Sequence, residues 1–112
     1  MLLRPVAALV LCLAAPASAL AGELPGPDLS ETRLRGCLLA GASAVTRSDL
    51  QGAVIQVRAF CGAQINRVRD LRVAAAMHGL KGEEAREAKD RAIRDLNQEI
   101  ALAVSNFTGL AQ

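Results

Sequence analysis

Apolar residues recur at three- and four-residue intervals along three stretches of this chain, a spacing that predicts three α-helices. The first helix is expected to begin near Asp28, where an acidic residue follows three positions later, as in a capping box. Between residues 37 and 45 only Ser43 is polar, so we expect this part of the helix to be buried on more than one side. The apolar positions of this helix are Leu34, Cys37, Leu38, Gly41 and Val45.

A second helix is expected after a short turn at residues 46–47. Ser48, with Gln51 three residues later, forms another capping-box pattern. Gly79 suits the left-handed position that follows a helix, and Leu80 suits the apolar position after it. One continuous helix is therefore predicted between these signals, with apolar positions at Val54, Val57, Cys61, Val68, Leu71 and Ala75 and polar Gln64 in the one gap.

The third helix is expected to start near Gly82, where Glu83 and Glu84 place negative charge at the positive end of the helix dipole. Its apolar positions again step by three and four, at Ile93, Leu96, Ile100, Ala103, Phe107 and Leu110. No alternating strand pattern competes with these helices. The predicted fold class is therefore all-α.

Two cysteines indicate how the first two helices pack. In an antiparallel pair of helices, residues at the same level have a nearly constant sum of residue numbers. For Cys37 and Cys61 this sum is 98, which centres the pair on residue 49, close to the predicted turn. We therefore predict a Cys37–Cys61 disulfide that staples an antiparallel helical hairpin, worth about 3 kcal/mol in the chain-entropy model.

A metal pair or a redox pair is the alternative interpretation of these cysteines. Only His78 could add a third ligand, and it lies about 25 Å from Cys61 along the same predicted helix. No CxxC motif is present. The pattern therefore favours a structural disulfide and predicts no metal site.

The same numbering argument places the third helix. If the second and third helices turn near residue 80, residue 30 lies beside residue 68, which lies beside residue 92. The first helix would then cover only part of the other two. The prediction is a three-helix bundle with a protruding two-helix arm of polar residues at 69–91, which should be its least stable part.

The N-terminal residues have the pattern of a secretory signal peptide. Arg4 precedes a ten-residue apolar run at 6–15, which is shorter than the ~20 residues of a membrane-spanning helix, and small residues follow Pro16. We expect cleavage before Gly22, with Leu20 as the alternative start. The predicted organisation is a signal peptide at 1–21, a flexible linker at 22–27 and a single helical domain at 28–112.

Charge and composition limit the classes of binding partner and the cellular location that we expect for this protein. Removal of Arg4 leaves 12 basic and 11 acidic residues, a balance that excludes a typical nucleic-acid binder. Arginine outnumbers lysine eleven to two, which together with abundant alanine favours a secreted protein of a bacterial periplasm. Membrane association is expected only through an uncleaved signal or weak surface contacts.

No catalytic set is recognisable, because no nucleophile stands with a base and no phosphate loop or haem motif occurs. We therefore predict neither an enzyme nor a cofactor. Two surface hypotheses remain. Met77, His78 and Leu80 would form a partner-docking tip at the end of the arm. Arg58, Arg69 and Arg72 share part of one helix face and could contact an anionic surface, unless they are paired with Glu87 and Asp90.

The resulting functional hypothesis is a non-enzymatic interaction protein, such as an envelope adaptor, inhibitor or chaperone. A homodimer is consistent with the nearly all-apolar first helix and the thin core. The alternative is a protein that binds a membrane surface or cell-wall polymer through its arginine face.

Overall fold

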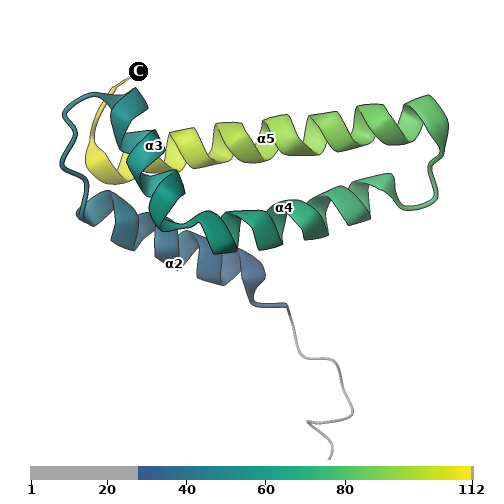
Figure 1. The fold of residues 1–112 in the computed structure, drawn as a ribbon, viewed down its shortest axis with the longest axis horizontal. Helices are drawn as coiled ribbons and strands as arrows, with labels where there is room; N and C mark the ends of the chain where they lie inside the picture. Colours follow the sequence, from purple (N-terminus) through teal and green to yellow (C-terminus); the bar gives the residue numbers. More distant parts are fainter. Residues whose placement is uncertain (1–27, 112) are drawn as a thin grey trace, which may run out of the picture.

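The computed structural model describes residues 28–111, so the predicted signal peptide and linker lie outside the described part. The described chain forms four α-helices and no strand, as the all-α prediction required. The helices are α2 (Ser30–Ser43), α3 (Leu50–Phe60), α4 (Gly62–Met77) and α5 (Gly82–Thr108). In Figure 1, α2 and α5 run in the same direction, and α4 runs opposite to both.

The prediction of one continuous second helix is wrong, because the chain changes direction at Cys61 between α3 and α4 (Figure 1). Cys61 has φ −105° and ψ 20°, outside the helical region. Its N–H still donates to the carbonyl of Val57 and its own carbonyl accepts from Ile65, both at 2.9 Å. Gly62 follows and has a low helix propensity, so the bend costs little there.

The helix ends follow the predicted signals with small shifts. The Asp28 carboxylate accepts the N–H of Ser30 at 2.8 Å, and α2 begins at Ser30. Asp49, rather than Ser48, caps α3 and accepts the N–H of Gly52 at 2.8 Å. Gly79 has φ +77°, as the predicted left-handed position requires.

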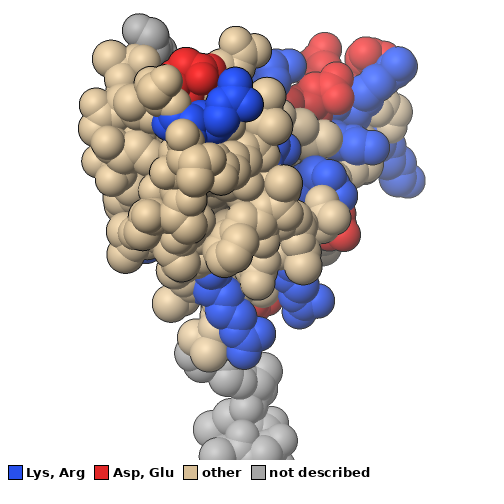
Figure 2. All heavy atoms as spheres, turned by 60° about the vertical axis from the view of Figure 1, so that its left-hand side comes forward, with Lys and Arg blue, Asp and Glu red and all other residues tan. Residues whose placement is uncertain are grey.

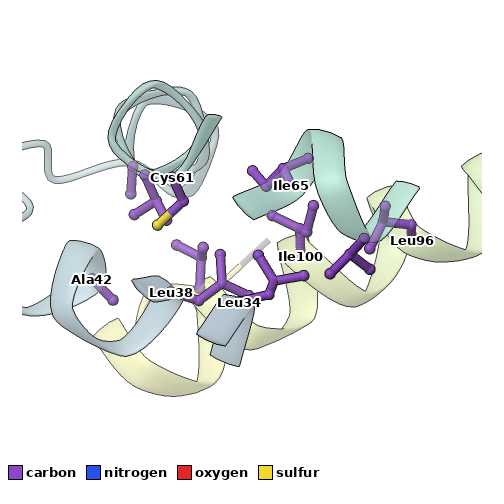
Figure 3. Packing of buried hydrophobic residues seen from close by; sticks show 11 residues of the cluster. Leu34, Leu38, Ala42, Cys61, Ile65, Leu96 and Ile100 are labelled. Carbon is purple, nitrogen blue, oxygen red and sulfur yellow. The ribbon is translucent and has the colours of Figure 1, made fainter. Parts of the chain in front are cut away.

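The predicted disulfide is confirmed. Cys37 of α2 is bonded to Cys61 at the α3–α4 junction, with a Cα–Cα distance of 5.8 Å. Around it, α2 packs against α3, α4 and α5 (Figure 3). The core consists of small and aliphatic side chains: Leu34, Leu38, Ala42, Ala53, Val57, Cys61, Ile65, Val68, Leu96, Ile100 and Val104.

The expectation that residues 37–45 are buried on more than one side is wrong. Leu39 is 51% exposed, and Ala40 is also exposed. The other helices all lie on one side of α2, so its opposite face is open to solvent within the described part of the chain. An apolar helix therefore has an uncovered apolar face.

The helices α4 and α5 extend beyond the N-terminal end of α2. From there they continue as a pair to the loop that connects them (Figure 1). We call residues 69–91 the arm and the rest of the described chain the body. Within the arm only Ala85 is buried. The arm therefore removes little apolar surface from water.

Candidate interaction surface

An open groove of about 530 Å³ lies between the parallel helices α2 and α5. Four buried leucine and isoleucine side chains make its apolar part, and partly exposed residues of the two helices make its rims. The lining residues are Glu31, Thr32, Leu34, Arg35, Leu38, Arg72, Leu96, Glu99, Ile100, Leu102, Ala103, Asn106 and Phe107.

The rim on α5 carries exposed apolar side chains, and the rim on α2 is polar. On α5, Leu102 is 47% exposed and Phe107 is 41% exposed. On α2 the rim includes Thr32 and Arg35, and Leu39 stands one turn after Arg35 on the same side of the helix. One face of the body thus holds both a hollow and projecting side chains.

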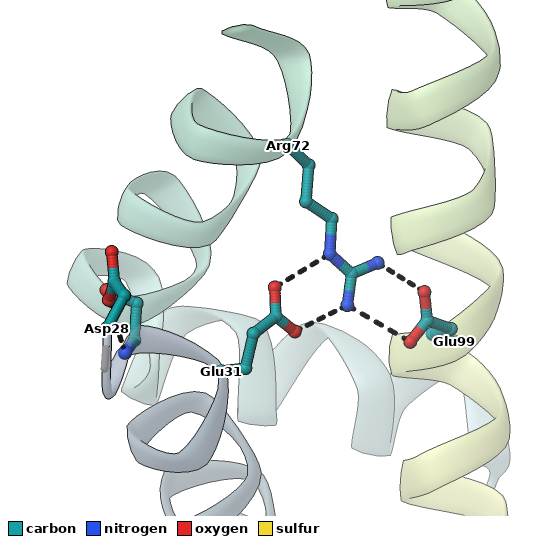
Figure 4. Close-up of polar contacts among 5 residues, drawn as sticks. Asp28, Glu31, Arg72 and Glu99 are labelled. Carbon is teal, nitrogen blue, oxygen red and sulfur yellow. Dashed lines mark hydrogen bonds and ion pairs between the residues drawn. The ribbon is translucent and has the colours of Figure 1, made fainter. Parts of the chain in front are cut away.

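Arg72 of α4 closes one end of the groove by bridging two carboxylates (Figure 4). Its Nε donates to Glu31 at 2.9 Å and its Nη2 donates to the other Glu31 oxygen at 2.6 Å, a two-point pairing. The same guanidinium donates to both oxygens of Glu99 on α5. Hydrogen bonds from Arg72 lower the pKa of Glu31, and the two carboxylates raise the pKa of Arg72. This cluster ties the start of α2 to α4 and α5.

Beyond that cluster, Arg35 is the one charged residue among those that line the groove. Residues 36–46 and 100–112 contain no Lys, Arg, Asp or Glu. Figure 2 shows the α2–α3 end of the body almost without charged side chains, which gather at its edges and on the arm. A partner can therefore cover this part of the body without burying an unpaired charge.

Eight large apolar side chains of the described chain are exposed. Both phenylalanines are among them, and six of the eight lie on the body. They are Leu29, Leu39, Ile55, Phe60, Leu102 and Phe107 on the body, with Leu71 and Leu80 on the arm.

The three arginines predicted to share an anion-binding face make different contacts. Arg58 donates to the amide oxygen of Asn97 at 3.1 Å, and Arg69 lies 3.5 Å from Asp70. Arg72 is held by Glu31 and Glu99, which are not the partners Glu87 and Asp90 named by the alternative. Of the three, Arg72 is thus the one engaged by two carboxylates.

The residues of the predicted tip lie at the α4–α5 loop, at the opposite end of the molecule from α3 (Figure 1). Met77 is half-buried, His78 is exposed, and Leu80 is 37% exposed. They are therefore far from the groove and form a separate surface.

Within residues 28–111, no three His, Cys, Asp or Glu side chains lie close enough together to hold a metal ion. None of the described helices has the length and apolar character needed to cross a membrane.

A second, smaller hollow of about 200 Å³ is lined by Ser30, Arg33, Ala63, Gln64 and Arg67.

Comparison with known proteins found no matching family model, no matching curated protein and no matching solved structure. The surface must therefore be interpreted from its own residues. Sequence reasoning did not single out the groove, although the printed sequence carries a signal for it. The longest uncharged stretch after residue 27, at 100–112, includes the groove residues Ile100, Leu102, Ala103, Asn106 and Phe107, and the next longest, at 36–46, includes Leu38.

Proposed function

We propose that this chain is an exported, periplasmic protein that acts without catalysis, by binding protein partners. The proposal assigns the binding to the body surface around the α2–α5 groove. The observation that carries it is the groove itself, with exposed Leu102 and Phe107 in its lining and exposed Leu39 beside it on α2.

Burial of large apolar side chains in an interface contributes favourable free energy to binding. Complete burial of one Leu, Ile or Phe side chain contributes about 1.5–3 kcal/mol. Contiguous exposed apolar patches on soluble proteins commonly mark interaction sites. The groove and the adjoining part of α2 at Leu39 combine such side chains with two stretches, 36–46 and 100–112, that carry no charged residue.

Export is part of the proposal and has separate support. The Cys37–Cys61 disulfide joins two helices across the core, and such bonds persist in oxidising compartments such as the periplasm. Production of the full chain in a bacterium should give a periplasmic species whose mass corresponds to a start at Gly22. A full-length protein found only in the cytoplasm, with both cysteines reduced, would overturn this part.

Site-specific photocrosslinking in cells that naturally produce the protein tests the binding surface. A photoreactive amino acid at Asn106, an exposed residue of the groove, should give protein adducts on illumination. The same amino acid at Glu87, exposed on the arm, is the matched control and should give none.

Two outcomes would contradict the assignment. The absence of adducts at both positions would argue against a protein partner altogether. Adducts at Glu87 alone would move the binding surface from the body to the arm, where the predicted tip lies.

A further inference from the structure

We infer that the partner of the α2–α5 face is a second copy of this chain. The inference deepens the proposed function and rests on it. The face consists of the groove, its two rims and the adjoining exposed side of α2 at Leu39.

Self-association requires that one surface be complementary to itself. In a two-fold dimer the same patch of both copies meets, so that patch must supply both the projecting side chains and the hollow that receives them. The α2–α5 face has the hollow above Leu38 and Ile100, and it has the projecting side chains of Leu102 and Phe107. It therefore carries both halves of such an interface.

The distribution of charge supports the same pairing. Three of the four charged residues that line the groove, Glu31, Arg72 and Glu99, form one cluster at its end, and the fourth, Arg35, lies one turn after Glu31 on α2. A two-fold axis near Asn106 and Phe107 would bring the uncharged halves of two copies together. It would leave both Arg72 clusters at the solvent-exposed periphery, and a central apolar contact with a polar rim is the usual anatomy of an interface.

Each helix can contribute to the contact along its uncharged length. The uncharged helical parts are residues 36–43 of α2 and 100–108 of α5, which span about 12 Å and about 14 Å, and two neighbouring helices present a face about 20 Å wide. Such a face is smaller than the roughly 800 Å² per partner of a standard stable complex. The dimer is therefore expected to be weak and reversible.

Sedimentation of the disulfide-bonded protein beginning at Gly22, followed over concentration, tests the inference. The mass should rise from one chain toward two. Leu102→Glu and Phe107→Glu should each raise the dissociation constant at least tenfold, because each places a charge in the apolar contact. Leu71→Glu is the matched control: Leu71 is 38% exposed on the arm, and its substitution should leave the dissociation constant unchanged.

Circular dichroism and an intact disulfide establish that each variant is folded. A wild-type protein that remains monomeric at about 1 mM would overturn the inference. An equal loss of association in the Leu71→Glu control would do the same, since the contact would then not be specific to this face.

Photocrosslinking at Asn106 separates the inference from the proposed function. Adducts with the mass of two copies support the dimer. Adducts that contain only a different protein would overturn the dimer and leave the proposed function standing, whereas the absence of any adduct would remove both.

Discussion

Arg72 of α4 joins three helices through polar contacts, since its guanidinium holds Glu31 of α2 and Glu99 of α5. Its side chain is only 28% exposed, so these pairs are better shielded from water than most surface ion pairs. Arg72→Met keeps the apolar stem and removes the charge. We expect it to lower the free energy of unfolding by about 1 kcal/mol at pH 7, measured by chemical denaturation.

The effect of this substitution should depend on pH in a defined direction. The pKa of Glu31 is lowered in the folded state, so its contribution is present above its unfolded pKa and is lost as the pH falls through the folded value. The difference between wild type and Arg72→Met should therefore narrow as the pH falls from about 5 to about 2. A difference that stays constant over this range would show that the ion pairs do not stabilise the fold.

Two glycines of α2 form a second test at this scale. A Cβ at Gly36 would meet no atom within 4 Å, so Gly36→Ala should stabilise the protein by about 0.5–1 kcal/mol through helix propensity. A Cβ at Gly41 would lie 3.1 Å from Phe60 Cδ1 and 3.3 Å from Val57 Cγ1. Gly41→Ala should therefore gain less, and thermal denaturation showing equal gains would contradict this packing.

At the scale of elements, the disulfide is placed where the chain bends. Cys61 is fully buried at the junction of α3 and α4, and its bond to Cys37 holds α2 against both helices. The apolar spacing continues unbroken from α3 into α4, because the apolar residues of both helices face the same core. The sequence pattern therefore does not reveal the bend at Cys61. The bridge thus fixes an arrangement of three helices, whereas the sequence had suggested only two.

Removal of the bridge should therefore be costly. The double variant Cys37→Ala, Cys61→Ala is expected to lose about 3 kcal/mol of stability, because the unfolded chain regains the freedom of a 24-residue loop and the core loses two sulfur atoms. Urea denaturation of this variant beside the disulfide-bonded wild-type protein measures the effect. A loss below about 1 kcal/mol would indicate that apolar packing alone holds α2 in place.

For the whole molecule, the contrast between body and arm predicts uneven stability. The arm has one buried residue, Ala85, whereas the body holds the other eleven buried apolar residues. Local opening should therefore cost less free energy in the arm than in the body. Native-state hydrogen exchange should show faster exchange for amides at 74–88 than for those of α5 at 96–104, and equal protection would contradict this division.

The sequence by itself determined the helical class, the approximate helix ends and the cysteine pairing. Caps, turn glycines and apolar spacing act within a few residues, so they can be recognised without knowing where the other helices lie. Asp49 illustrates the precision of such signals, since the observed cap lies one residue beyond the expected Ser48.

Only the tertiary structure decided the break at Cys61, the exposed face of α2, the α2–α5 groove and the partners of Arg72. Each of these depends on the directions in which the helices cross, which are set by contacts between residues far apart in the chain. Glu31 and Glu99 are 68 positions apart, and no local pattern indicates that one arginine holds both. The helices follow from local chemistry, whereas the surface proposed for binding arises only from how they are packed.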